Sequence, residues 1–215
     1  MTASGARPQV EDERAPALVV RLRPEGSVAR LDADGVETAV LVERARRGER
    51  QAESLLYRRY APGLLEVATH LLRSVPAAED VLHDAFLLAY SRLGQLRAAS
   101  QFRGWLLAII VSLVKKRLRR QRLLRWVGLE AVADAPLDVQ ARDGASVEAR
   151  GELAVLDAAL KALPVAQRMA WMLRYVEGEK LDDVALAMGK SLATTKRYLA
   201  KAEAHLARHV SLEEP

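Results

Sequence analysis

The sequence predicts an all-α protein made of two small helical domains joined by a linker. Alanine, leucine and arginine dominate the 215 residues and aromatic residues make up only 5%, a composition that favours helix over sheet. Apolar residues recur every three to four positions over residues 38–125 and again beyond residue 150, which is the helical period. No stretch alternates between apolar and polar residues in the manner of a strand. Half of the residues are hydrophobic, so each domain can bury a core.

The first domain is predicted over residues 37–126, after a mobile N-terminal tail at 1–36 that is punctuated by proline and glycine. A short helix should end near Gly48, and a longer one, over 49–73, should be kinked or divided by Pro62. A third helix over 76–93, a loop at 94–100 and a long helix at 101–126 complete this domain.

The linker is predicted at residues 127–149, where glycine, proline and aspartate interrupt the periodicity. The second domain follows at 150–210, and a short tail occupies 211–215. In the second domain a short and a long helix meet at Gly189-Lys190-Ser191, which is the spacing of a helix-turn-helix. Ser191 is suited to cap the second of these two helices.

Charge is distributed unevenly along the chain. Residues 37–125 carry 17 basic and 8 acidic residues, a net +9, whereas residues 126–150 carry a net −3. A basic block of this kind favours a polyanionic partner such as nucleic acid. The absence of cysteine fits a reducing compartment, and no secretory signal or membrane-length apolar run is present, so we expect a cytoplasmic protein without a membrane span.

Two ligand-binding interpretations fail on spacing. "GKS" at Gly189 is the tail of a phosphate-binding loop, but Val184 stands where that loop needs its first glycine. His205 and His209 are four residues apart, yet no cysteine or carboxylate completes a metal site near them. We therefore predict no metal site and no cofactor.

The last long helix carries the clearest candidate site. Its apolar residues share one face and should pack on the preceding helices: Leu192, Thr195, Leu199, Ala202 and Leu206. The opposite side presents hydroxyl, guanidinium and ammonium groups that suit phosphates and base edges in a major groove. The candidate DNA-binding residues are Ser191, Thr194, Lys196, Arg197 and Lys201.

Two further surfaces lie in the first domain. The helix over 101–126 carries a narrow polar strip on an otherwise apolar first half: Ala108, Ser112, Lys115, Lys116 and Arg119. It ends in "KKRLRRQRLLR", which holds seven cations in eleven residues and could bridge several phosphates. The helix over 76–93 places Asp80, His83, Asp84 and Leu87 on one face, an arrangement that suits a basic protein surface.

Four motifs in order, "AEDVLHDAFLLAY", "FRGWLLAI" with its basic tail, "LKALPVAQRMAWMLRYVEG" and "MGKSLATTKRYLAKAEAHL", resemble a bacterial RNA polymerase sigma factor of the extracytoplasmic-function (ECF) type, in the sigma-70 family. The resemblance covers about residues 38–125 and 150–209. It implies two helical domains that bind core RNA polymerase and recognise the −10 and −35 promoter elements, in a protein that is not itself an enzyme. It also implies an anti-sigma factor as a frequent partner, which nothing in the sequence itself encodes.

Carried over by position, the resemblance gives each surface a role. Asp80, His83, Asp84 and Leu87 would contact core polymerase, while Ser112, Lys115, Lys116 and Arg119 would meet the −10 strand. The family commonly has polar groups at the positions of Ala108 and Val111, and asparagine and an acidic or amide residue at those of Ser112 and Lys116, so we expect an unusual −10 preference. The −35 helix matches at Ser191, Thr194, Lys196, Leu199 and Lys201 and departs at Thr195, Arg197, Tyr198 and Ala200.

Two other functions remain open on the residues alone. A helix-turn-helix regulator acting without core polymerase would explain the last helix but not the acidic face over 80–87. A helical interaction module whose basic tail touches membrane or RNA would leave the helix-turn-helix unexplained.

Overall fold

The computed structural model describes residues 35–126 and 147–209, and every regular element within these two ranges is helical. The predicted all-α class is therefore confirmed. Predictions for the tails, and for the linker up to residue 146, lie outside the described residues. None of the helices in the described ranges combines the length and the apolar character that a membrane crossing requires.

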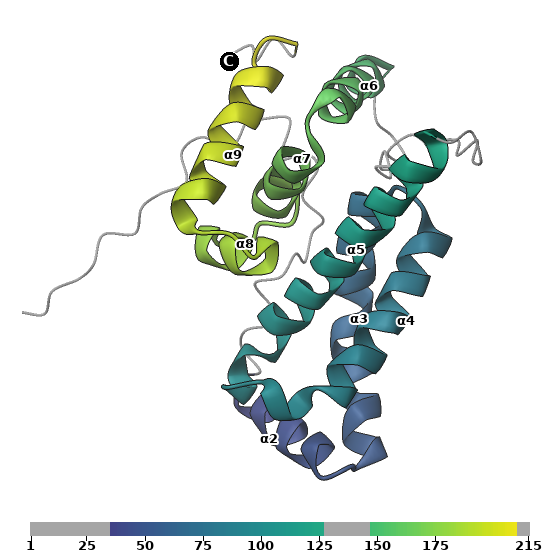
Figure 1. Ribbon diagram of the computed structural model, residues 1–215, viewed down its shortest axis with the longest axis vertical. Helices are drawn as coiled ribbons and strands as arrows, with labels where there is room; N and C mark the ends of the chain where they lie inside the picture. Colours follow the sequence, from purple (N-terminus) through teal and green to yellow (C-terminus); the bar gives the residue numbers. More distant parts are fainter. Residues whose placement is uncertain (1–34, 127–146, 210–215) are drawn as a thin grey trace, which may run out of the picture.

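The N-terminal domain is built on three long helices that run side by side, with a shorter one across their end (Figure 1). Two single turns of 3₁₀ helix, η2 and η3, connect the last two long helices. The elements are α2 (Gly35–Arg46), α3 (Arg50–Leu72), α4 (Val75–Ser91), η2 (Leu93–Gln95), η3 (Ala99–Gln101) and α5 (Phe102–Trp126).

Local sequence signals explain most of these boundaries. Gly48 follows α2 with a φ of 81°, the left-handed conformation that glycine adopts most easily. The Ser74 side chain caps α4 by accepting a hydrogen bond from the Ala77 amide, and proline occupies the first turn. Pro62, in contrast, lies inside an uninterrupted α3. The predicted division of the helix at Pro62 is wrong, because buried residues on both sides of Pro62 pack against the core and hold the helix together.

The C-terminal domain consists of α6 (Val147–Ala162), α7 (Val165–Trp171), η4 (Met172–Val176), α8 (Leu181–Met188) and α9 (Leu192–Leu206). Here η4 is a π-helical turn that continues α7. The helix α6 begins at Val147, slightly before the predicted boundary at residue 150. The turn between α8 and α9 uses Gly189 in the left-handed conformation, with φ 60° and ψ 42°, as the sequence predicted.

The two domains pack against each other through α5 and α8 (Figure 1). The buried apolar side chains of both domains form one continuous cluster, from Leu41 in α2 to Leu206 in α9. The helix α5 therefore has neighbours on two sides, α3 and α4 of its own domain and α8 of the other. This position decides which of its polar groups are accessible.

Candidate nucleic-acid and protein interfaces

The helix α9 is fixed at its start by a side-chain cap. The Ser191 hydroxyl accepts a hydrogen bond from the Thr194 amide at 3.2 Å and lies 3.0 Å from the Thr194 hydroxyl. The cap satisfies one of the free amides that begin every helix. The predicted cap is confirmed, and it places Ser191 and Thr194 together at the N-terminal end of α9.

The two predicted faces of α9 are distinct in the structure. Thr195, Leu199, Ala202 and Leu206 are buried on α7 and α8, whereas Lys196, Arg197 and Lys201 are exposed. Leu192 differs from the prediction, since it is 40% exposed. Leu192 is the first residue of α9, and burial of the apolar stripe begins only at Thr195.

The predicted protein-binding face of α4 is also formed. Asp80, His83, Asp84 and Leu87 are all exposed, and Leu87 is 56% exposed. On the opposite side of α4, Val81, Leu82, Ala85, Phe86 and Ala89 are buried. Asp80 lies 3.1 Å from the Arg117 guanidinium of α5, so part of this acidic face is paired with a cation of its own domain.

The polar strip on α5 is not uniform. Ser112, Lys116 and Arg119 are exposed, but Lys115 is half-buried and donates a hydrogen bond of 2.7 Å to the Met188 carbonyl at the C-terminal end of α8. Burial lowers the pKa of the Lys115 ammonium, and the nearby charge of Lys190 lowers this pKa further. Of the four residues predicted to meet the −10 strand, three are therefore accessible and Lys115 is engaged by the other domain.

The two positions where the family commonly has polar groups also differ from each other. Ala108 is half-buried, and Val111 is fully buried. Val111 thus belongs to the core of the molecule and not to the strip, so a base could not reach it in this arrangement.

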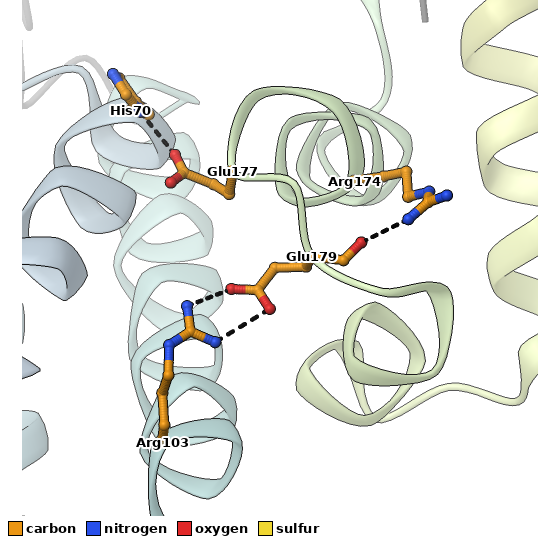
Figure 2. A network of polar contacts seen from close by, with 5 residues as sticks. All are labelled: His70, Arg103, Arg174, Glu177 and Glu179. Atoms are coloured by element: carbon orange, nitrogen blue, oxygen red, sulfur yellow. Dashed lines mark hydrogen bonds and ion pairs between the residues drawn. The ribbon is translucent and has the colours of Figure 1, made fainter. Parts of the chain in front are cut away.

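The structure also contains a polar network that the sequence did not indicate (Figure 2). The Glu177 carboxylate accepts a hydrogen bond from His70 of α3, with 2.7 Å between Oε1 and Nδ1. Glu179 holds the Arg103 guanidinium of α5 with two hydrogen bonds, of 2.5 and 3.1 Å. Arg174 donates to the Glu179 carbonyl at 2.9 Å. Both glutamates are only 2% exposed.

A third ion pair joins α6 to the residue that follows α3. The Arg73 guanidinium contacts both carboxylate oxygens of Asp157 in α6, at 2.6 and 2.7 Å. Burial alone would raise the pKa of Asp157, but Arg73 and then Lys161 outweigh it, so the pKa of this carboxyl lies below its usual value. All three pairs join residues of different domains.

Two family models match the chain. Sigma-70 region 2 matches residues 56–123, and Sigma-70 region 4 matches residues 153–206. The ECF RNA polymerase sigma factor SigM of Mycobacterium tuberculosis is 33% identical over 162 residues, which cover 75% of this chain and 78% of SigM. The chain belongs to the ECF sigma factors of the sigma-70 family. It is a sigma factor that directs promoter-specific transcription by RNA polymerase.

Other relatives agree with this assignment. The ECF sigma-E factor of Escherichia coli K12 is 29% identical over 181 residues, covering 76% of this sigma factor and 88% of the relative. Two solved structures share the fold. RpoE in complex with the anti-sigma factor NepR, from Bartonella quintana, has a TM-score of 0.58 and 22% identity, and the match covers 75% of this chain and 98% of that one. CnrH in complex with the cytosolic domain of CnrY has a TM-score of 0.57 and 20% identity, and the match covers 82% of this chain and 99% of that one.

The matched regions contain all three surfaces of this sigma factor. The α4 face and the α5 strip lie within the region 2 match, and the exposed side of α9 lies within the region 4 match. The residues of the interdomain pairs, among them His70, Arg103 and Glu179, also lie within the matched ranges. Sequence reasoning missed them because each was interpreted with its neighbours in the chain. The segment "YVEGEKL" places two carboxylates beside a glycine, but nothing in it indicates their partners.

Proposed function

We propose that the three surfaces divide the work of transcription initiation between them. The α4 face, comprising Asp80, His83, Asp84 and Leu87, binds core polymerase. The strip of Ser112, Lys115, Lys116 and Arg119 on α5 contacts the −10 element. The exposed side of α9, with Ser191, Thr194, Lys196, Arg197 and Lys201, reads the −35 element. The protein would act as a non-enzymatic subunit of the polymerase in the cytoplasm.

The observation that carries this proposal is the exposed cationic side of α9. Its cap and its buried stripe hold the helix rigidly, while Lys196, Arg197 and Lys201 project from the opposite side. A recognition helix contacts base edges with residues near its N-terminal end. Arginine can grip a guanine edge with two hydrogen bonds, and lysine acts as a point charge toward phosphate.

The α4 face supports polymerase binding over the alternative of a DNA-binding regulator that acts alone. Asp84 is exposed although its domain is rich in basic residues that could pair with it. Leu87 is exposed although the domain has an apolar core that could bury it. An exposed leucine beside carboxylates is typical of a protein-binding surface. A DNA-binding regulator that acts without polymerase would not need such a protein-binding face.

An anti-sigma factor is a second partner that we propose. The solved structures of RpoE and CnrH are complexes, RpoE with the anti-sigma factor NepR and CnrH with the cytosolic domain of CnrY. Both share the fold of this chain, which supports a protein partner able to bind its two domains.

Run-off transcription tests the proposed function. Purified chain is added to core polymerase with the DNA upstream of its own coding sequence as template. We expect a transcript that starts at one position and requires both the chain and the −35 sequence. Transcription that is independent of the chain, or of the −35 sequence, would remove α9 as the promoter reader.

A further inference from the structure

The segment that joins α4 to α5 is fastened to α2. It consists of η2 and η3 with three residues between them, and both short turns pack against α2 at the lower end of the domain in Figure 1. Leu93 and Leu96 anchor the segment, because these residues are only 3% and 5% exposed. We call residues 92–101 the η2–η3 loop.

The Arg46 guanidinium, at the last residue of α2, supplies the polar part of this attachment. Its Nε donates to the Leu93 carbonyl at 3.1 Å, and one of its terminal nitrogens donates to the Leu96 carbonyl. The other terminal nitrogen donates to Glu43 at 2.5 Å. The Arg46 side chain is only 25% exposed, so water competes little for these bonds. Every nitrogen of the guanidinium is therefore engaged within the protein.

The attachment requires the geometry of arginine. The donors of a guanidinium lie in a rigid planar fork, so Arg46 can bond to two loop carbonyls and one carboxylate at the same time. Lysine has a single ammonium on a flexible stem and cannot reach three acceptors spread in this way. Loss of the fork would leave the Leu96 carbonyl without this donor beside a buried side chain, which costs free energy.

The outer side of the η2–η3 loop presents hydrogen-bonding side chains to the solvent. They are exposed, and in the part of the chain that the structure describes none of them has a hydrogen-bonding partner: Gln95, Arg97, Ser100 and Gln101. Polar groups that a rigid scaffold presents on a loop are a common form of recognition site. One cation and no acid among them suits nucleic acid.

The loop continues the face of α5 that carries the polar strip. From Ser112, helical steps of four, three and four residues toward the start of α5 lead to residues of which none is buried: Ala108, Trp105 and Gln101. The distance from Ser112 to Gln101 along the helix axis is about 16 Å, or about five nucleotide steps of about 3.4 Å. A DNA strand on the strip that extends in this direction therefore reaches the loop.

We propose that Arg46 is a positioning residue for −10 recognition. It acts without touching DNA, by holding the η2–η3 loop so that Gln95, Arg97 and Ser100 can bond to the strand that the α5 strip binds. The inference rests on the proposed function of that strip. A loop without this attachment samples more conformations, and DNA must then fix one of them on binding, which weakens the contact.

Hydrogen exchange of the full-length chain tests whether Arg46 holds the loop. In Arg46→Ala we expect the amides of residues 93–101 to exchange about tenfold faster or more, because two hydrogen bonds from a charged group are lost. The amides of 106–114, in the buried part of α5, should be unaffected. Arg47→Ala is the matched control, since it removes the same charge one residue later and its guanidinium pairs with Glu49. It should leave loop exchange unchanged.

Promoter binding by reconstituted holoenzyme tests the consequence. Arg46→Ala should reduce discrimination between the −10 sequence of the promoter and −10 variants by about tenfold. Discrimination among −35 variants and the affinity for core polymerase should stay at the wild-type level, as should all three in Arg47→Ala. Gln95→Ala and Arg97→Ala remove exposed groups of the loop itself, so they should reduce −10 discrimination while loop exchange stays slow.

Arg46→Lys separates positioning from direct contact with DNA. Lysine keeps the charge but not the fork, so a positioning role predicts a loss of −10 discrimination close to that of Arg46→Ala, with the salt dependence of the wild type. A direct phosphate contact predicts instead that lysine restores binding and that alanine flattens the salt dependence by about one unit of slope. That second result would overturn the proposal.

Unchanged loop exchange in Arg46→Ala, or faster exchange with −10 discrimination intact, would overturn it as well. Far-UV circular dichroism checks that each variant keeps its helices. A wild-type holoenzyme without any −10 preference would overturn the proposed function of the strip and the recognition role of the loop with it. The exchange data would in that case still show whether Arg46 holds the loop, so the two failures can be told apart.

Discussion

The two proposed reading surfaces, one on α9 and one on α5, carry the same kinds of residue but differ in what covers them. On α9, Arg197 and Lys201 face away from the helices beneath and are exposed. On α5, Lys115 is held by the end of α8 and is half-buried. The difference arises because α9 lies at the edge of the molecule with neighbours on one side only, whereas α5 lies between its own domain and α8.

This comparison teaches that a cation on a helix is not by itself an available site. The affinity of α9 for DNA should depend on its own side chains and its cap. The affinity of the α5 strip should depend in addition on whether α8 stays packed on α5 and holds Lys115. The variants below separate these contributions, from the largest expected effect to the smallest.

The largest effect should come from Asp84→Lys, because Asp84 lies on the exposed face of α4. Placing a cation against a basic polymerase surface should weaken core binding by about 2–5 kcal/mol if the carboxylate is buried in the complex. Titration of labelled chain with core enzyme, without DNA, measures this. Asp182→Lys in α8 makes the same charge change in the other domain and serves as control. Equal losses for both variants would mean a general charge effect.

The next effect concerns the exposed side of α9. Arg197→Ala should cost about 1–3 kcal/mol of promoter binding and relax the preference at one or two −35 positions. Lys201→Ala, its neighbour one turn along, should weaken binding to all sequences alike and flatten the salt dependence by about one unit of slope. Holoenzyme binding to a panel of −35 variants at several salt concentrations separates the two. If promoter choice is unaffected by either change, α9 does not read sequence.

A smaller effect is expected at the cap of α9. Ser191→Ala removes the hydroxyl that accepts from the Thr194 amide and should lower the free energy of unfolding by about 1 kcal/mol. Denaturant unfolding followed by circular dichroism measures it. Ser54→Ala, an exposed serine within α3, is the control and should change stability little. Loss of −35 binding well beyond the loss of stability would show that Ser191 also contacts DNA.

The smallest effect should be the pH dependence of the packing between the two domains, through the His70–Glu177 contact. Burial alone would lower the pKa of His70, but the hydrogen bond to Glu177, the charge of Glu177 and that of Glu66 outweigh it, so the pKa lies above 6.5. The His70 imidazole therefore binds its proton more tightly when the domains are packed than when they are apart. The contribution of His70 to domain packing is complete below pH 6.5 and is lost as the pH rises through the raised pKa of His70.

Two spin labels, attached at Ser54→Cys in α3 and Ala158→Cys in α6, measure the distance between the domains over a pH series, since the sequence contains no other cysteine. We expect fewer chains with packed domains as the pH rises above about 6.5. The Arg73–Asp157 pair should not contribute in this window, because the carboxyl of Asp157 titrates below 3.8. His70→Gln should remove the pH dependence, and His209→Gln, at an exposed position after α9, should preserve it. A pH-independent wild type would show that His70 does not help to hold the domains together.

Much of the candidate site could be predicted because it depends on local rules. Gly189 and Ser191 mark the turn and the cap of α9 through their own conformational and hydrogen-bonding preferences. The buried and exposed sides of α4 follow from helical periodicity and the hydrophobic effect. These signals span at most a few turns of helix, so the sequence contains them in full.

Other features depended on packing that no local signal carries. Pro62 stays within α3 and Val111 is buried beneath the strip because neighbouring helices supply contacts at those positions. The partners of Glu177 and Glu179 are 107 and 76 residues away in the chain. No periodicity relates residues at such separations, so the interdomain pairs could not be predicted from the sequence.

The sequence by itself determined the helices, their caps and the exposed sides of α4 and α9, because each follows from residues that are near neighbours on one helix. Only the tertiary structure decided that α8 lies on α5, that Lys115 is engaged and that two buried glutamates join the domains. The physical reason is that burial and ion pairing depend on which surfaces meet in space, and that placement is set jointly by both domains.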